Sequence, residues 1–378
     1  MNAQLINFGS DFAWKYYANK FGVNPELRKF DSLGLLLKGT ETLFFRPKFS
    51  ANFFRLENEI LIVGNFKELV DFSFELSANN SDWGNLAESV LSNYENFDDG
   101  IISIAGKNFS LNQPHIMGIL NVTPDSFSDG GNYFDKDKAI EHALQMIKEG
   151  AEIIDVGGES TRPGADAVPV EEELERVIPV ITAIKAKEPQ TVISIDTTKS
   201  KVAEEAIKAG ASIVNDISGF SFDEQILEVV KKYNVTYILM HIKGTPRTMQ
   251  KNPEYEEPVS EIYDFLTQKI SRLIDLGIGK IIIDPGIGFG KRFFDNYEII
   301  NRLDEFKGLG FPILIGLSRK SFLGNSLGLK IDERDTITSV AEAISVSKGA
   351  RFIRTHNVAN ASVMKNFINY LSNTESLL

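Results

Sequence analysis

The feature that most constrains this chain is a unit that recurs eight times after residue 114. Each unit is a short apolar run, a turn with Gly or polar residues, and a stretch with helical spacing. The runs occupy residues 115–121, 152–158, 191–197, 212–218, 236–241, 280–286, 312–318 and 351–357. They are rich in Ile and Val and nearly continuous, which is typical of strands buried on both faces.

The stretches between these runs have the apolar spacing of amphipathic helices. In residues 135–149, for example, Ile140, Ala143 and Ile147 lie on one stripe. Further helices are predicted at 171–187, 199–209, 223–233, 258–276, 295–306, 336–349 and 359–371. Eight strand–helix units in about 260 residues match a TIM barrel, whereas an open doubly wound sheet commonly has five or six strands. We therefore predict an α/β fold with a (β/α)8 TIM barrel.

The first part of the chain lacks this pattern and predicts a separate, smaller α+β domain. Its predicted elements are strands at 42–49 and 59–66 and helices at 67–77 and 85–97. We place the boundary near residue 98, with an N-terminal domain over 1–98 and the barrel domain over 99–378. The N-terminal domain can be a scaffold or dimer contact, or a regulatory or partner-binding module.

Composition excludes several classes of protein. The chain has 378 residues, a net charge of −12 and no cysteine, so disulfides, thiolate nucleophiles and cysteine-ligated zinc are excluded. The acidic balance argues against broad nucleic-acid binding. Every apolar run is shorter than the roughly 18 residues that a membrane span needs, and the first residues lack a secretory-signal pattern. We expect a cytoplasmic protein with neither nucleic-acid nor membrane partners.

Polar side chains stand at the ends of most of the predicted strands. In a TIM barrel the carboxyl ends of all strands meet at one rim, where the chemistry of such folds lies. The residues at these ends are Asn121, Asp196, Asn215, His241, Asp284, Ser318, Arg319, Lys320, Arg354 and His356. Each alone has a purely structural explanation, since such an Asp commonly caps the next helix and a lone His commonly packs in a core. Their joint occurrence favours a binding site.

The residue types indicate a ligand with two different ends. Asp196, Asn215 and Asp284 can read a heterocycle edge that carries several N–H donors. Cationic side chains at the same rim can hold a polyanion such as pyrophosphate. These cations are Arg162, Arg319, Lys320, Arg354 and His356. The sequence has no HExxH or paired-His spacing, so a Mg²⁺ carried by the substrate fits better than a structural metal.

Long motifs over residues 115–371 resemble those of the dihydropteroate synthase family. They are, in the family's order, GILNVTPDSFSDGG (118–131), DVGGESTRPG (155–164), SIDT (194–197), NDISG (215–219), MH (240–241), DPGIGFGK (284–291), SRKS (318–321) and RTH (354–356). One departure is Ile287, where many relatives carry Phe. This apolar exchange leaves the ring of Phe289 in place.

The resemblance implies a reaction of folate biosynthesis. In this reaction 6-hydroxymethyl-7,8-dihydropterin pyrophosphate condenses with p-aminobenzoate to give 7,8-dihydropteroate and pyrophosphate. The implied mechanism is Mg²⁺-assisted loss of pyrophosphate, followed by attack of the arylamine on a pterin cation. The resemblance also implies a homodimer and inhibition by sulfonamides that compete with p-aminobenzoate.

The same resemblance assigns roles to individual residues. Asp196, Asn215, Asp284 and Lys320 are implied to hold the pterin with Met240 against its ring, Arg354 and His356 to hold the pyrophosphate near Thr161, and Asn121 to contact Mg²⁺. Phe127, Arg162, Pro163, Phe289 and Ser321 are implied to line the p-aminobenzoate pocket. Asp129 is implied to lie near the charge that develops on the pterin methylene. The implied catalytic set is Asp129, Asp196, Lys320, Arg354 and His356.

Two other functions stay open at this point. A pterin-binding, methyltransferase-like barrel would share the fourth and sixth strand ends, but it is not expected to carry both the 118–131 and the 155–164 motifs. A silent paralogue that acts as a binding or assembly partner would be free to lose site residues. The intact Asn121, Lys320 and Arg354 speak against that second alternative.

Overall fold

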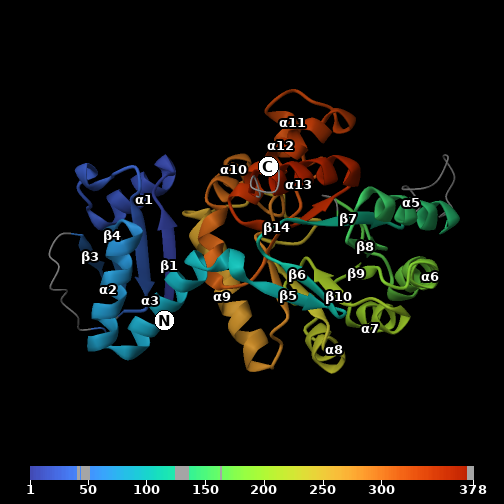
Figure 1. Cartoon of the computed structure of the whole chain (residues 1–378), viewed down its shortest axis with the longest axis horizontal. Coiled ribbons are helices and arrows are strands. Elements are labelled where there is room, and N and C mark those ends of the chain that lie inside the picture. The colour runs from blue at the N-terminus through green and yellow to red at the C-terminus, as the bar shows by residue number, and fades with distance from the viewer. Residues whose placement is uncertain (41–42, 44–51, 124–135, 162–163, 373–378) are drawn as a thin grey trace.

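The computed structural model describes residues 1–40, 43, 52–123, 136–161 and 164–372. It consists of a small N-terminal α+β part and a larger barrel beside it, as Figure 1 shows. No helix in these ranges has both the length and the apolar character needed to cross a membrane. The two parts touch along one edge of the N-terminal sheet and helices on one side of the barrel.

The N-terminal part is a four-stranded antiparallel sheet with helices on both faces. Its elements are β1 (Asn2–Asn7), α1 (Asp11–Phe21), β2 (Leu33–Lys38), β3 (Phe53–Leu56), β4 (Glu59–Gly64), α2 (Phe66–Asn79) and α3 (Ser81–Glu95), in the sheet order β1-β2-β4-β3. Alternate side chains of β2 enter different cores: Leu35 and Leu37 pack on the α2–α3 side, and Leu36 packs on the α1 side. The predicted α+β class is therefore confirmed.

Several elements of this part differ from the prediction. β4, α2 and α3 match predicted elements, whereas β1, β2, β3 and α1 were not predicted. The predicted strand at 42–49 falls almost wholly outside the described residues. The domain boundary near residue 98 stays a prediction.

A two-stranded hairpin connects the two parts. It consists of β5 (Ile101–Ile104) and β6 (Lys107–Ser110), which pair antiparallel. The ring of Phe109 lies 5.0 Å from that of His115 and 5.8 Å from that of Phe352. Because His115 begins the first barrel strand, the hairpin covers the amino ends of the strands.

Eight parallel strands close into a barrel, which confirms the predicted fold. They are β7 (His115–Asn121), β8 (Ile153–Gly157), β9 (Val192–Asp196), β10 (Ile213–Asp216), β11 (Thr236–Met240), β12 (Ile281–Asp284), β13 (Ile313–Ile315) and β14 (Ala350–Thr355). β14 pairs with β7 to complete the circle, with Phe352 opposite His115. Parallel closure aligns every strand in the same direction, so all carboxyl ends open on one rim.

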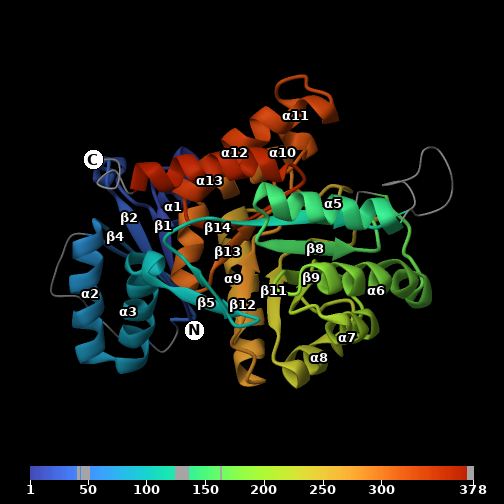
Figure 2. The same cartoon turned by 45° about the vertical axis from the view of Figure 1, so that its right-hand side comes forward.

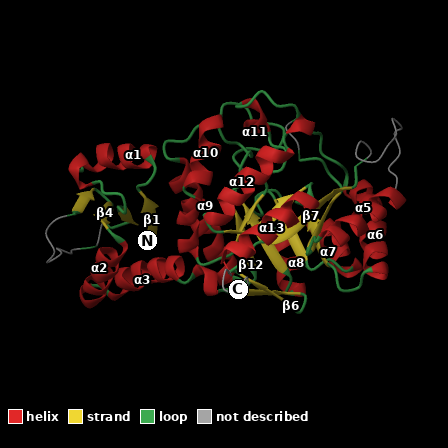
Figure 3. Cartoon of the chain, turned by 45° about the horizontal axis from the view of Figure 1, so that its top comes forward, coloured by secondary structure: helices red, strands yellow, loops and turns green. Residues whose placement is uncertain are grey.

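Helices surround these strands, as Figure 3 shows. They are α5 (Lys136–Glu149), α6 (Val170–Lys187), α7 (Ser200–Ala209), α8 (Ile226–Tyr233), α9 (Pro258–Asp275), α10 (Phe293–Asn301), α11 (Ser321–Asn325), α12 (Asp335–Ser347) and α13 (Val358–Ser372). One predicted helix is wrong: residues 295–306 belong partly to α10 and partly to a 3₁₀ helix, η3 (Leu303–Leu309). Arg302 separates the two helices.

Candidate active site

Arg354 is the centre of a charged cluster at the strand ends. Its Nε donates to Asp155 Oδ2 at 2.6 Å, and its Nη2 donates to Asp196 Oδ2 at 2.6 Å. Asn215 Nδ2 donates to the same oxygen of Asp155 at 3.0 Å. The four side chains come from β14, β8, β9 and β10, so closure of the barrel brings them together. Such charge-assisted hydrogen bonds hold both partners in a fixed geometry.

Two carboxyl groups of this cluster, those of Asp196 and Asp155, remain able to bind a ligand. Burial raises the pKa of Asp196 to about 7, although the neighbouring Arg354 opposes that rise. Asp155 Oδ1 is buried and has no hydrogen-bond partner among the described residues. A perturbed carboxyl group and an unpaired buried oxygen are features that favour a functional site over a purely structural one.

A second pair, Asp284 and Lys320, lies across the rim. Burial raises the pKa of Asp284 and lowers that of Lys320 to about 7, even though each group favours the charged form of the other. Lys320 Nζ donates to the carbonyl of Ile287 and lies 4.2 Å from the centre of the Phe289 ring. Lys320 is thereby packed against the Gly-rich segment that follows β12.

That Gly-rich segment is built on close backbone contacts. Gly286 has φ +68°, and a Cβ added there would lie 1.8 Å from the carbonyl oxygen of His241. Gly288 has φ +85°, and its Cβ would lie 2.7 Å from Lys320 Cδ. Only glycine allows both the left-handed turn and this approach. The segment therefore fixes Phe289 between the loop after β11 and Lys320.

His241 and Lys291 form a buried pair beneath this segment. Lys291 Nζ lies 2.7 Å from His241 Nδ1 and donates to the carbonyls of His241 and Phe289, both at 3.1 Å. Burial lowers the pKa of Lys291 and that of His241 well below their usual values. These contacts give His241 a structural role, as expected for a packed histidine.

The remaining predicted residues on the described chain lie around the same rim. His356 Nδ1 lies 3.0 Å from Ser318 Oγ, and Met240 packs in a small apolar cluster beside Phe289. Asn121 ends β7 opposite Gly157. Thr161 is half-buried in the loop after β8, and Ser321 begins α11 as an exposed residue.

Some predicted residues do not join this arrangement. Arg319 pairs with Asp335 through two hydrogen bonds, of 2.8 and 3.0 Å, instead of facing the rim as a free cation. Phe127, Asp129, Arg162 and Pro163 lie outside the described residues, and their places in the site stay predictions.

One contributor was not singled out as a site residue. Asp155 is 1% exposed and holds both Arg354 and Asn215. The signal for Asp155 is present in the sequence, because a carboxylate within a buried apolar strand requires a hydrogen-bonded or charged partner.

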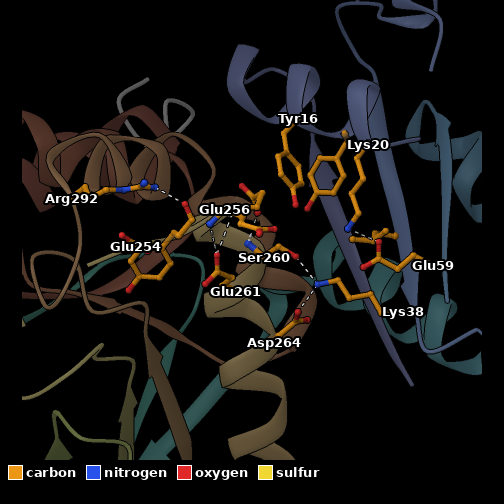
Figure 4. A pocket seen from close by; sticks show the side chains of 14 residues that line it. Tyr16, Lys20, Lys38, Glu59, Glu254, Glu256, Ser260, Glu261, Asp264 and Arg292 are labelled. Atoms are coloured by element: carbon orange, nitrogen blue, oxygen red, sulfur yellow. Dashed lines mark hydrogen bonds and ion pairs between the residues drawn. The ribbon is translucent and has the colours of Figure 1, made fainter. Parts of the chain in front are cut away.

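A cleft of about 630 Å³ lies elsewhere, between the N-terminal part and the barrel. Figure 4 shows Tyr16, Lys20 and Lys38 on one side and residues from the loop before α9 on the other. Lys38 Nζ bridges Asp264 at 2.5 Å and Ser260 at 2.6 Å across this cleft. None of the predicted site residues on the described part of the chain lines it, so the cleft is distinct from the rim residues described above.

The fold and the rim together define a barrel of the pterin-binding class. The family model for pterin binding enzymes matches residues 117–356. The dihydropteroate synthase of Clostridium beijerinckii is 47% identical over 265 residues, which cover 69% of this chain and 96% of that protein. The enzyme of Escherichia coli is 46% identical over 255 residues, or 67% of this chain and 90% of that protein.

Solved structures agree with these sequence matches. Yersinia pestis dihydropteroate synthase in a sulfonamide drug complex is 38% identical with a TM-score of 0.68, covering 72% of this chain and 99% of that one. The Xanthomonas albilineans enzyme in complex with 7,8-dihydropteroate is 35% identical with a TM-score of 0.65, at the same coverages. The chain belongs to the dihydropteroate synthase family.

Proposed function

We propose that this chain condenses 6-hydroxymethyl-7,8-dihydropterin pyrophosphate with p-aminobenzoate, forming 7,8-dihydropteroate and pyrophosphate in folate biosynthesis. The observation that carries this proposal is the joint placement of Asp196, Asn215 and Arg354 with Asp284 and Lys320 on one rim. Acceptors for a pterin and cations for a pyrophosphate thus lie within one site, in a barrel of the matching family.

The pterin ring is held, in this proposal, by short acceptors and one amine. Asp196, Asn215 and Asp284 supply oxygens to the N–H groups of the ring, and Lys320 donates to a ring acceptor. Met240 packs against the ring face from the end of β11. The raised pKa of Asp196, about 7, follows from burial, and a ligand with N–H donors would favour its ionised form.

The pyrophosphate is held by Arg354 and His356, with Thr161 beside them. Arg354 is already oriented by Asp155, so little side-chain freedom is lost when the anion binds. We assign Mg²⁺ to the same end, near Asn121. The described residues contain no group of three His, Cys, Asp or Glu able to hold a metal. One amide oxygen together with substrate oxygens suits a substrate-carried Mg²⁺, which neutralises charge on the leaving group when bound.

The chemical step needs stabilisation of positive charge more than a strong base. As the C–O bond to pyrophosphate breaks, its electron pair leaves with the phosphate oxygen, and the pterin methylene becomes cationic. Carboxylates of Asp129 and Asp196 stabilise that cation. The lone pair of the arylamine nitrogen then forms the new C–N bond, and the proton from that nitrogen passes to the released pyrophosphate or to water. Phe127, Arg162, Pro163, Phe289 and Ser321 are assigned to the p-aminobenzoate pocket.

We also propose a homodimer through the outer barrel helices. Figure 2 shows α12 and α13 side by side. They carry exposed apolar residues, namely Val340, Ile344, Val363 and Phe367. Several exposed apolar side chains on two neighbouring helices favour protein contact there. Sulfonamides are expected to compete with p-aminobenzoate, and a cytoplasmic location stays a prediction.

Steady-state pyrophosphate release by the full chain tests the proposed reaction. Release should require the pterin pyrophosphate, p-aminobenzoate and Mg²⁺ together, and a sulfonamide should raise KM for p-aminobenzoate without lowering kcat. Pterin binding without turnover would support the silent paralogue. Methyl transfer from a methylated pterin, with no pyrophosphate release, would support the methyltransferase-like alternative.

A further inference from the structure

We propose that the N-terminal domain positions two loops at the rim, the loop between β11 and α9 and the Gly-rich segment after β12. We further propose that Gln4 transmits this effect from the N-terminal domain to the loops through its hydrogen bonds. This inference rests on the proposed function, because it assigns an effect on p-aminobenzoate binding through Phe289. It gives residues 1–98 a defined role in the reaction, although none of the site residues that the structure describes at the rim comes from them.

Gln4 joins two elements of the barrel from the edge strand β1. Its side chain is fully buried, with an exposed fraction of 0%. Its Oε1 accepts a hydrogen bond from Ser260 Oγ on α9 at 2.8 Å, and its Nε2 donates to Glu305 Oε2 on η3 at 3.1 Å. Both polar atoms of the Gln4 side chain therefore form hydrogen bonds, and both partners, Ser260 and Glu305, belong to the barrel domain.

The partners of Gln4 belong to a buried ionic cluster. Arg302 is fully buried and binds the carboxylates of Glu257, Glu298 and Glu305. One cation faces three carboxylates, so further donors are needed to satisfy the acidic oxygens. Burial raises the pKa of Glu305 to about 7, although Arg302 opposes that rise.

The N-terminal domain supplies those donors. The backbone N–H of Asn7 donates to Glu305 at 2.7 Å, and Ser10 Oγ donates to Glu298. Without this domain the carboxylates of Glu298 and Glu305 would lose these donors. Leaving buried charged oxygens unsatisfied is strongly unfavourable. The cluster therefore keeps its geometry only while the domain is docked.

The same cluster holds the end of the loop that follows β11. Glu257, which binds Arg302, also accepts the N–H of Ser260 at 2.5 Å and begins α9. Two residues earlier, Tyr255 Oη donates to the carbonyl of Gly290 at 2.7 Å, and Arg292 donates to the Tyr255 carbonyl at 2.9 Å. Figure 4 shows Glu256, Ser260 and Arg292 from this region beside the interdomain cleft.

These contacts lead to the predicted p-aminobenzoate pocket. Gly290 follows Phe289 directly, and Phe289 lies against Lys320. Hydrogen bonds therefore link Gln4 to Ser260 and Ser260 to Glu257. Two residues before Glu257 in the chain, Tyr255 hydrogen-bonds to Gly290 in the Gly-rich segment. Asn93 makes an interdomain contact away from this segment, since it donates to the Gly308 carbonyl at 3.1 Å near the end of η3. Docking and loop positioning can therefore be separated by mutation.

The test compares Gln4→Met with Asn93→Ala in the full chain. Met nearly preserves the volume of Gln but removes both hydrogen bonds, whereas Asn93→Ala removes a docking contact that is not linked to the loops. We expect Gln4→Met to raise KM for p-aminobenzoate about five- to tenfold, equivalent to about 1 to 1.4 kcal/mol, with kcat within about twofold. Asn93→Ala should lower the Tm without changing this KM.

A double-mutant cycle with Tyr255→Phe tests the coupling itself. Both single variants should raise KM for p-aminobenzoate, and the double variant should raise it by less than the product of the two factors. Ser260→Ala breaks the same hydrogen bond from the barrel side and replaces Gln4→Met if that variant does not fold. An unchanged KM in Gln4→Met or Ser260→Ala, with a lowered Tm, would overturn the inference, since the domain would then be a docking partner only.

Amide hydrogen exchange tests the positioning role of Gln4 without depending on turnover. Amides of residues 243–257 and 286–291 should exchange faster in Gln4→Met than in Asn93→Ala. If the wild-type chain has no turnover but this exchange difference appears, the proposed function fails and the positioning role is retained. If the wild-type chain is active and exchange in both segments is the same in the two variants, the positioning role fails alone.

Discussion

Removing the guanidinium of Arg354 should make the stability of this protein depend on pH in a specific way. Arg354→Met leaves Asp155 and Asp196 buried without their shared cation. Breaking a buried ion pair on one side lowers the free energy of unfolding by about 3 to 5 kcal/mol near neutral pH. Because the Asp196 carboxyl is protonated at lower pH, the decrease in the free energy of unfolding caused by Arg354→Met also depends on pH.

The sign follows from the pKa of Asp196. Burial raises it from 3.8 to about 7 in the wild-type protein, while Arg354 opposes the rise. A carboxyl group with a raised native pKa contributes stability below its unfolded pKa and loses that contribution as pH rises to the native pKa. In the wild type, the free energy of unfolding therefore stops falling with pH near pH 7. Without Arg354 the pKa of Asp196 is higher still, so the free energy of unfolding keeps falling above pH 7.

Urea unfolding of both proteins between pH 6 and 8.5 measures the difference. Below pH 7 the gap in unfolding free energy should be constant, and above pH 7 it should widen by about 1.4 kcal/mol per pH unit. The double variant Asp196→Asn/Arg354→Met removes the Asp196 carboxyl and should widen the gap less than Arg354→Met does, since Asp155 alone then lacks its cation. A gap that stays the same across the whole range in Arg354→Met would refute the reasoning.

Three further predictions concern other parts of the site. Burial lowers the pKa of Lys320 to about 7, so the affinity for pterin pyrophosphate, measured by calorimetry, should fall by up to about tenfold per pH unit above pH 7. Lys320→Met should flatten this pH dependence, and an unchanged slope in that variant would exclude Lys320 as its source. Asp129→Asn should lower kcat about 100-fold while changing pterin affinity little, and equal losses in both would contradict the cation-stabilising role. Gly286→Ala places a Cβ 1.8 Å from the His241 carbonyl oxygen and should destabilise the protein by about 2 to 4 kcal/mol in thermal unfolding, whereas an unchanged Tm would show that the loop can relax.

The barrel could be predicted because its strands are buried on both faces. Such strands form continuous apolar runs, and the run at 236–241, for example, contains the whole of β11 (Thr236–Met240). The predicted helix at 295–306 was wrong because no Gly or Pro marks its break. The break occurs at Arg302, whose burial depends on carboxylates from η3, α10 and α9 and on the N-terminal domain. That environment is tertiary and leaves no local signal.

The N-terminal sheet was less predictable for a related reason. β2 is a run of leucines without strong β-branched character, and it is buried because helices cover both sides of the sheet. At the active site, the residues at strand ends followed from the barrel topology alone. The pairing of Arg354 with Asp155, 199 positions apart, did not. Sequence spacing carries no information on which rim residues face each other across a closed sheet.

The most direct test of the account is to identify the products made by the purified full chain. The chain is incubated with 6-hydroxymethyl-7,8-dihydropterin pyrophosphate, p-aminobenzoate and Mg²⁺, and both products are quantified by mass spectrometry and a pyrophosphate assay. We expect 7,8-dihydropteroate and pyrophosphate in equal amounts, with neither formed when p-aminobenzoate is left out. Binding of both substrates without formation of 7,8-dihydropteroate would contradict it.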